Sequence, residues 1–339
     1  MDRLLREAGP HTCHPGGSAS NVLRAAARFG ATTRLVGALG DDANGAMYAR
    51  SLRDAGICTE HLIVKGRDAS GTQLSTAACC VVSHGNERSM RTMFADTASL
   101  EISELRQDLF KGCKYLFLSS YACYFEGMLA RLADIGTSVG CRILLDLGSF
   151  EIVNAFSDQI DGIFGKVDIC VCNADEAAAF SRLHAGVVDS DRAYDSAARW
   201  MLGHGLKVAA VVTLGEGGCI LYERAGDGDA FRKTLHPAVD PEVPVVDSTG
   251  AGYDTLSDLA RPLTFTRSYT LPRAHSMFSA PSFSDAFCGG LLFALSKGRE
   301  LNDAVRVANA AGAAAVTSLG AVLDDDSLEW FRRKVAEVS

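Results

Sequence analysis

Short apolar runs alternate with helix-like segments along most of the chain, and this alternation constrains the fold more than any other feature. The runs are β-branched and nearly all apolar, which is typical of parallel strands buried on both faces. The expected strands span residues 33–36, 76–82, 115–118, 142–146, 169–171, 209–213 and 218–222. The expected helices span residues 20–29, 45–55, 126–136, 175–182, 191–203, 285–297 and 301–317. We therefore predict an α/β fold with a parallel sheet covered by helices on both faces.

The length and the net charge of the chain limit the number of domains and the kinds of partner that we expect. The 339 residues can bury a large core, as one α/β domain or two smaller ones. A net charge of −8 disfavours nucleic acid or an anionic membrane as the main partner, and no apolar run is long enough to span a bilayer. The eleven cysteines show no disulfide framework, which favours a reducing, cytoplasmic location. The first residues resemble neither a signal peptide nor an anchor, but an incomplete start leaves an organellar address open.

A glycine pair precedes the first expected helix, in Gly16-Gly17-Ser-Ala-Ser-Asn21. Two glycines let a ligand approach the backbone closely, and Asn21 offers both a donor and an acceptor on the first turn. A glycine-rich turn with a polar cap is also a common structural feature, so both interpretations stay open. The following Val36-Gly-Ala-Leu-Gly40-Asp-Asp-Ala-Asn-Gly45 predicts a strand, a tight turn and a helix start.

Two later turns carry polar residues directly after apolar strands. Asn173-Ala-Asp-Glu176 places an amide and a carboxylate on one face of a starting helix, where they are able to hold a hydrated Mg²⁺. A simple capping box explains the pair equally well. Thr213-Leu-Gly215-Glu-Gly217-Gly218 predicts a glycine turn between two strands of a hairpin. His11-Thr-Cys13-His14 lacks a second ligand pair, so we expect no metal there.

The strongest single signal is Asp247-Ser-Thr-Gly250-Ala-Gly252, whose small residues at a helix start predict an anion hole of backbone amides. The helix that such a turn requires does not follow, because residues 253–284 differ in composition and are rich in Ser, Thr, Arg and Pro. A continuation appears at Asp285-Ala-Phe-Cys-Gly289-Gly. Residues 253–284 therefore form an insertion inside the motif.

The order of these motifs resembles that of the PfkB (ribokinase-like) kinase family. The matching motifs are GG-x3-N, VG-x2-GDD-x2-G, N-x2-E, TLGEGG, and DSTGAG with DAF-x-GG. The resemblance extends from Gly16 to about Gly320 and implies one kinase domain, a three-layer α/β/α sandwich with a mostly parallel sheet and a small β lid. Residues 72–82 and the turn at 85–91 are expected in that lid. It also implies transfer of the ATP γ-phosphate to a hydroxymethyl group of a sugar, nucleoside or similar alcohol, and leaves a homodimer open.

Carried over residue by residue, the resemblance implies the acceptor and catalytic sites. The acceptor would contact Gly16, Gly17 and Asn21. The anion hole would consist of Gly250, Ala251 and Gly252. The general base that normally follows GAG is matched by Asp285, and we favour it over the nearer Asp254 because the residues after Asp254 do not continue the family helix. We expect the small residues after Asp285 to pack its helix closely against the sheet.

The resemblance also implies cofactor sites for ATP, Mg²⁺ and a monovalent cation such as K⁺. Mg²⁺ and its waters would be organised by Asn173 and Glu176. The monovalent cation would be bound with the help of Asp247 and Thr249. The nucleotide site would be lined by Thr213, Gly215 and Gly218, with Asn309 near adenine.

The chain departs from the family pattern at two places. Only 15 residues precede Gly16, where family members usually carry a strand, so we expect the N-terminal strand to be missing. The second departure is the insertion, which we interpret as translated intron sequence, because its removal joins Gly252 to Asp285 and restores DSTGAGDAF. An evolved loop near the active site is the competing interpretation.

The sequence thus predicts an ATP-dependent PfkB-type carbohydrate kinase. A catalytically impaired kinase-fold protein with a role in an assembly is a second hypothesis, because the insertion separates the anion hole from its base. A dinucleotide-dependent oxidoreductase is disfavoured, since no GxGxxG stands between a strand and a helix.

Overall fold

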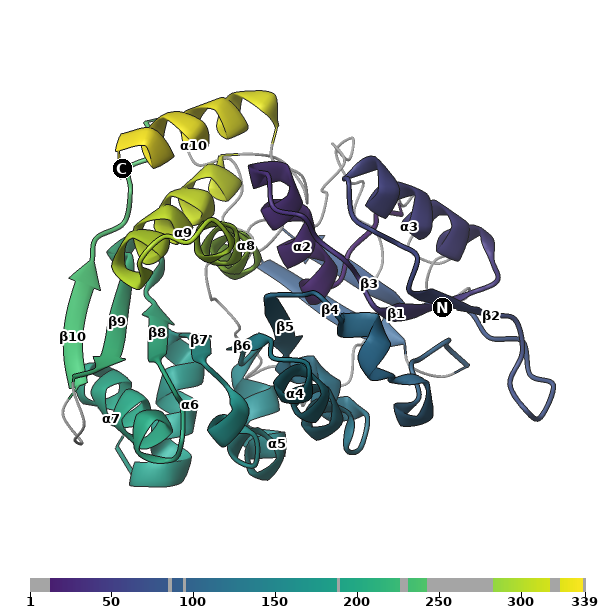
Figure 1. Ribbon diagram of the computed structural model, residues 1–339, viewed down its shortest axis with the longest axis horizontal. Coiled ribbons are helices and arrows are strands. Elements are labelled where there is room, and N and C mark those ends of the chain that lie inside the picture. Colours follow the sequence, from purple (N-terminus) through teal and green to yellow (C-terminus); the bar gives the residue numbers. More distant parts are fainter. Residues whose placement is uncertain are drawn as a thin grey trace.

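A six-stranded sheet forms the centre of the computed structural model, which describes residues 13–84, 87–93, 96–187, 190–225, 231–242, 283–317 and 324–337. Its strands are β5 (Tyr115–Ser119), β6 (Arg142–Asp146), β7 (Ile169–Asn173), β8 (Ala209–Thr213), β9 (Cys219–Arg224) and β10 (Phe231–His236). They lie in the order β10-β9-β8-β7-β6-β5 (Figure 1). The strands from β5 to β8 are parallel, and β9 and β10 are antiparallel to their neighbours.

Helices cover both faces of this sheet. One layer contains α2 (Ser18–Phe29), α8 (Phe283–Ser296), α9 (Leu301–Val316) and α10 (Asp325–Glu337). The other layer contains α4 (Met128–Ser138), α5 (Phe150–Asp161), α6 (Ala174–Ala185) and α7 (Ser190–Gly203). The two layers lie on opposite sides of the strands (Figure 1). The predicted α/β/α sandwich is therefore confirmed.

The period of two in the strands explains why both layers have a core. In β7 and β8, Val171 and Val211 are buried in the α2/α8/α9 core, whereas Cys172 and Val212 are buried in the α4–α7 core. Alternate side chains of a strand point to opposite faces, so a strand covered on both faces must be apolar throughout. This is the pattern that the sequence shows.

Four further strands and α3 (Ala43–Asp54) lie beside the sandwich (Figure 1). Strands β1 (Gly37–Gly40) and β2 (Leu62–Lys65) pair in parallel. Strands β3 (Ala78–His84) and β4 (Glu87–Met93) form an antiparallel hairpin. The predicted turn at 85–91 is thus wrong from Glu87 onward, because these residues pair with β3. The cross-strand ladder overrides the polar composition of this segment.

The GDD motif joins β1 to the start of β3. Asp42 caps α3 by accepting a hydrogen bond from Gly45 N at 2.7 Å, and it also accepts from Thr76 N at 2.8 Å and Thr76 Oγ1 at 2.7 Å. A Cβ on Gly40 would lie 2.5 Å from Thr76 N, so only glycine permits this approach. The motif therefore holds the lid strands against the first helical segment.

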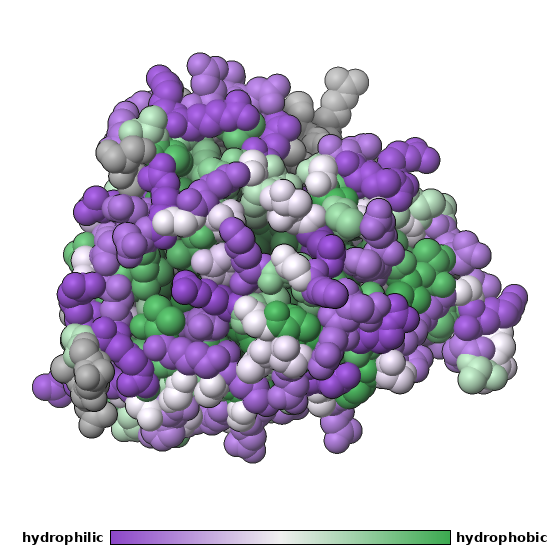
Figure 2. All heavy atoms as spheres, in the orientation of Figure 1, coloured by the Kyte–Doolittle hydropathy of each residue, from purple (hydrophilic) through white to green (hydrophobic). Residues whose placement is uncertain are grey.

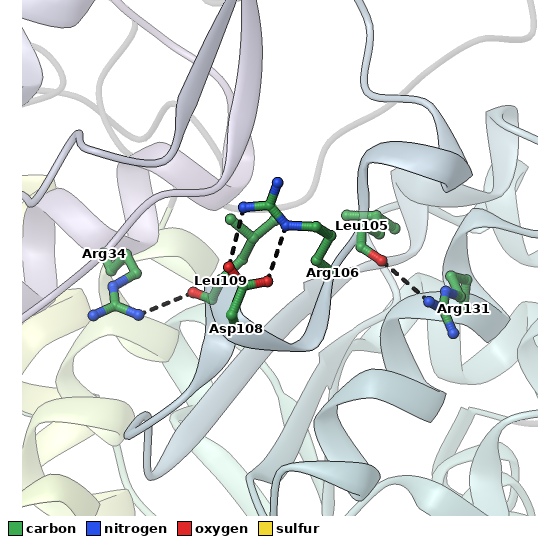
Figure 3. Close-up of polar contacts among 6 residues, drawn as sticks. All are labelled: Arg34, Leu105, Arg106, Asp108, Leu109 and Arg131. Carbon is green, nitrogen blue, oxygen red and sulfur yellow. Dashed lines mark hydrogen bonds and ion pairs between the residues drawn. The ribbon is translucent and has the colours of Figure 1, made fainter.

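Arginine side chains hold the segment between β4 and β5 in place by donating hydrogen bonds to its backbone carbonyl groups (Figure 3). It contains the 3-10 helices η1 (Ile102–Glu104) and η2 (Gln107–Phe110). Arg34 donates to Leu109 O at 2.9 Å, and Arg131 of α4 donates to Leu105 O at 3.1 Å. The remaining 3-10 helices are η3 (Ser120–Tyr124), η4 (Phe164–Lys166) and η5 (Gly215–Gly217).

Figure 2 shows a face dominated by hydrophilic residues, with hydrophobic residues in small groups between them. No helix within the described ranges is both long and apolar enough to cross a membrane.

Candidate active site

Asp285 lies in the first turn of α8, where its carboxylate is buried against the N-terminal turn of α2. Its Oδ1 accepts a hydrogen bond from Ser18 Oγ at 3.1 Å, and its Oδ2 accepts one from Asn21 Nδ2 at 3.1 Å. The structure therefore brings together the predicted base and the predicted acceptor turn. Asn21 Oδ1 is buried without a hydrogen-bond partner in the described part of the chain, which leaves an acceptor available beside Asp285.

The glycine turn before α2 has the conformation that its sequence predicts. Gly17 is the N-cap of α2 with φ 107°, in the region that favours glycine. Asn21 N donates to Gly17 O at 2.9 Å, and Ser20 Oγ donates to Gly16 O at 2.8 Å. Gly17 has no side chain that could cap α2, which suits a helix start whose first N–H groups bind a ligand.

Close packing between helices holds Asp285 in place. A Cβ on Gly289 would lie 2.6 Å from the Cβ of Ala25 in α2, and one on Gly290 would lie 2.5 Å from the Cβ of Ala311 in α9. The expectation that the small residues after Asp285 pack against the sheet is therefore wrong for these two glycines, which face neighbouring helices. The bulkier residues of α8, such as Phe287 and Leu291, fill the core instead.

Asp146 is a site residue that the motif analysis missed. It is the last residue of β6, and Ser284 at the start of α8 donates to its Oδ1 at 3.4 Å. Burial, together with the neighbouring Asp285 carboxylate, raises the pKa of Asp146 to about 7. The available signal was a single carboxylate at the end of an apolar strand, the edge where parallel sheets bind ligands.

Asn173 and Glu176 form the capping box that the sequence allowed. Asn173 Oδ1 accepts from Glu176 N at 2.8 Å, while Glu176 accepts from Asn173 N and Asn173 Nδ2, each at 2.9 Å. Burial raises the pKa of Glu176 well above its ordinary value, and the Asp146 carboxylate contributes to this rise. Beyond its capping role, the Glu176 carboxyl group interacts electrostatically with that of Asp146.

The acidic pair has the donor chemistry that a hydrated Mg²⁺ requires. Magnesium takes oxygen ligands and keeps several of its waters. The Asp146 carboxylate raises the pKa of Glu176, and a nearby cation would relieve the repulsion between their charged forms. No group of three or more His, Cys, Asp or Glu side chains gathers at metal-binding distance in the described ranges. The donors therefore fit an ion held largely through water.

The glycine turn after β8 is the predicted hairpin. Thr213 is the buried last residue of β8, and its Oγ1 donates to Cys172 O at 3.4 Å. Gly215 and Gly218 have φ of 56° and 84°, and a Cβ on Gly218 would collide with the backbone of His236 and Pro237. Gly215 has open space where a Cβ would stand. Thr213 thus lies at the same sheet edge as Asp146 and Asn173.

Asn309 is buried inside α9, with its side chain against the end of β10, at the same sheet edge as Thr213. Its Nδ2 donates to the carbonyl oxygens of His236 and Pro237, both at 3.3 Å. Its Oδ1 is buried without a hydrogen-bond partner in the part of the chain that the structure describes. The side chain fixes the chain that leaves β10.

An aromatic group also lies near Asp146. The Tyr121 ring packs on Gly148, two residues after Asp146, and Tyr121 OH donates to Gly148 O at 3.4 Å. Tyr121 stacks with Tyr124 at a centroid separation of 6.4 Å, and both rings are partly exposed. Aromatic residues at a loop start gave no motif in the sequence, so this group was not predicted.

The remaining predicted site residues lie outside the described ranges. They are Asp247, Thr249, Gly250, Ala251 and Gly252. The alternative base Asp254 lies outside as well.

A carboxylate at a helix start, a glycine turn and buried acids after parallel strands lie at the edge where α/β folds bind their ligands. Comparison with known families matches residues 3–255 and 285–327 to the pfkB family carbohydrate kinases. The chain belongs to this family and is a carbohydrate kinase. Residues 256–284 lie between the two matched ranges.

Known relatives agree with this assignment. Probable fructokinase-4 of Arabidopsis thaliana is 26% identical over 325 residues, which cover 91% of this chain and 83% of the relative. Adenosine kinase from Sinorhizobium meliloti has a TM-score of 0.71 at 20% identity, covering 98% of this chain and 87% of that one. Aminoimidazole riboside kinase from Salmonella enterica, solved with aminoimidazole riboside and an ATP analogue, has a TM-score of 0.65 at 24% identity. The latter match covers 96% of this chain and 92% of that one.

Proposed function

We propose that this carbohydrate kinase transfers the γ-phosphate of ATP to a hydroxymethyl group of a sugar or nucleoside, with Asp285 as the general base. The observation that supports this most is the contact of Asp285 with Ser18 and Asn21 across α8 and α2. An alcohol nucleophile needs a carboxylate within hydrogen-bond reach that accepts its proton. The hydrogen bonds from α2 orient the Asp285 carboxylate for this task.

In the proposed reaction, the alcohol oxygen forms a bond to the γ-phosphorus while the bond from phosphorus to the bridging oxygen of ADP breaks. The alcohol proton passes to Asp285. The acceptor binds at the turn formed by Gly16, Gly17 and Asn21, where the unpartnered Asn21 Oδ1 accepts a hydrogen bond from a sugar hydroxyl. We propose that the backbone amides of Gly250, Ala251 and Gly252 stabilise the equatorial phosphoryl oxygens.

Asp146, Asn173 and Glu176 would organise the waters of Mg²⁺. When bound, the ion neutralises charge on the nucleotide phosphates. We propose that Asp247 and Thr249 hold a monovalent cation such as K⁺ beside the anion hole. Both proposals are testable by titration of the cation.

The nucleotide would lie along Thr213, Gly215 and Gly218, at the same edge of the sheet. The side chain of Asn309 would act there as a positioning residue, because it holds the carbonyl groups of His236 and Pro237. Those backbone positions border Gly218, where no room for a Cβ exists.

The test is Mg²⁺-dependent ADP formation, measured with a coupled assay over a panel of sugars and nucleosides. A thermal-shift screen with an ATP analogue selects the acceptors. We expect at least one acceptor to stimulate ADP formation and to appear as a phosphate ester by ³¹P NMR. The proposal fails if no acceptor stimulates ADP formation, either in the full chain or in a form without residues 253–284.

A further inference from the structure

A second concave site lies at the opposite end of α8 from Asp285. It is an open cavity of about 490 Å³, between the first residues of β5 and β6 and the end of α8. The lining residues are Lys114, Tyr115, Gly140, Arg142, Leu295, Ser296, Lys297 and Gly298. Asp285 and Leu295 of the cavity are ten positions apart along α8, which corresponds to about 15 Å, since a helix rises ~1.5 Å per residue.

The charge of this cavity contrasts with that of the whole chain. Three of its lining side chains are cationic and none is acidic, although the chain carries a net charge of −8. Lys114, Arg142 and Lys297 are exposed, and none of them forms an ion pair with another described residue. Lys297 Nζ lies 5.7 Å from the centroid of the Phe293 ring, a contact that leaves its charge uncompensated.

The end of α8 does not account for three cations. A helix C-terminus carries roughly half of one negative charge, which a single lysine offsets. The last carbonyl groups of α8 are already paired with backbone N–H groups: Lys297 N donates to Ala294 O at 3.1 Å, and Gly298 N donates to Leu295 O at 3.0 Å. Lys114 directly precedes β5 and Arg142 begins β6, where no such dipole requires a cation.

We propose that this cavity binds a small organic phosphate. Its volume exceeds that of a single phosphate ion and falls in the range of small-molecule sites. Arg142 provides a fork of donors for phosphate oxygens, and Lys114 and Lys297 add charge on either side. Tyr115, which donates its hydroxyl to Leu295 O at 3.4 Å, provides with Leu295 a wall for the carbon skeleton.

The test is titration calorimetry of the full chain with ribose 5-phosphate, inorganic phosphate and ribose, at 0.15 M salt. The pocket variant is Arg142→Gln combined with Lys297→Gln, and the matched control is Arg53→Gln, which removes an exposed cation from α3. We expect ribose 5-phosphate to bind and ribose not to bind. The pocket variant should lose about tenfold or more in affinity, because each charged hydrogen bond contributes on this scale.

Comparison of the variants separates this cavity from the candidate active site, which also handles phosphate. Ribose 5-phosphate affinity that is equal in the wild type and the pocket variant would overturn the proposal, as would the absence of binding. A loss of the same size in Arg53→Gln would overturn it too, because the effect would then be general attraction. If the double variant does not fold, Lys114→Gln measures the same contribution from another element. The outcome does not depend on whether the chain phosphorylates a sugar.

Discussion

The carboxyl groups of Asp146, at the end of β6, and Glu176, in the first turn of α6 after β7, are both buried. Their charged forms repel each other. Burial raises the pKa of Asp146 to about 7, against an ordinary value near 4. The folded chain therefore binds more protons than the unfolded chain between these two values. The free energy of unfolding should then fall as pH rises from about 4 to about 7, by up to ~1.4 kcal/mol per pH unit from this group.

We predict that Asp146→Asn removes this part of the pH dependence in the metal-free protein, and that the variant is more stable than the wild type at pH 8. Urea unfolding at pH 5, 6, 7 and 8 measures it. The matched control is Asp326→Asn, which changes an exposed carboxylate on α10 and should leave the curve parallel to that of the wild type. If the free energy of unfolding changes with pH in the same way in the wild type and in Asp146→Asn, the raised pKa of Asp146 is contradicted.

Glu176→Gln tests the proposed metal face. The glutamine keeps one acceptor for the capping box but removes the charge that attracts Mg²⁺. We expect the Mg²⁺ concentration for half-maximal activity to rise about tenfold or more, as for other residues that orient metal-bound water, with little change in the acceptor KM. Glu329→Gln, an exposed residue of α10, is the control. An unchanged Mg²⁺ titration with a large rise in the acceptor KM would reverse the assignment.

At the scale of elements, the site depends on how closely α8 approaches α2 and α9. We predict that Gly289→Ala destabilises the fold by about 1–3 kcal/mol, because its Cβ would lie 2.6 Å from that of Ala25 and 2.8 Å from Val22 O. Chemical denaturation measures the change. Gly203→Ala adds the same methyl group to the end of α7, where no atom lies within 4 Å, and it should be neutral or stabilising. Equal effects of the two substitutions would show that α8 tolerates a wider separation.

Strand and helix positions could be predicted where the local pattern was strong. Strands β6 and β8 have the expected bounds, because Arg142–Asp146 and Ala209–Thr213 are short apolar runs with clear ends. The expected strand at 33–36 was displaced: only Arg34 forms an isolated bridge there, and β1 begins at Gly37. Strand β10 (Phe231–His236) was missed, because an edge strand with exposed charges lacks the buried pattern.

The candidate site could be predicted only where its residues stand in a motif. Asn21 and Asp285 do so, and their contact across 264 positions confirms that the two segments meet. Asp146 gave only the signal of a single carboxylate at the end of an apolar strand, which did not identify it, because its role depends on which strand end lies next to α8. The prediction that Gly289 packs against the sheet was wrong for the same reason, because the sequence does not say which neighbour a small residue faces.

At the scale of the whole molecule, we propose that residues 253–284 are an insertion of intron origin inside one kinase domain. The gap in the family match supports an insertion, since it leaves out residues 256–284 and resumes at Asp285. The last two residues of the proposed insertion, Phe283 and Ser284, form the first turn of α8. In a spliced chain, residues 251–252 would take the positions of Phe283 and Ser284. The first of these positions lies beside Gly312, where a Cβ would stand 2.5 Å from the Phe283 ring.

We predict that deletion of residues 253–284 gives a folded and more active enzyme, because it restores DSTGAGDAF and rebuilds the anion hole directly before its base. Transcript sequencing should show a major form that lacks 96 nucleotides (32 × 3). The deleted form should also unfold at no lower temperature, despite losing the Phe283–Phe287 stack. Only long transcripts, together with a deletion variant that loses activity, would make the segment a functional loop.

The most direct test of the account is the turnover number of Asp285→Asn with an acceptor found in the panel, measured beside Asp254→Asn. We assign the base to Asp285, which Ser18 and Asn21 hold at the head of α8. We predict that Asp285→Asn lowers kcat by about 10²- to 10⁴-fold with nucleotide affinity nearly unchanged, while Asp254→Asn stays close to the wild type. Near-normal turnover in Asp285→Asn, with loss of turnover in Asp254→Asn, would contradict it.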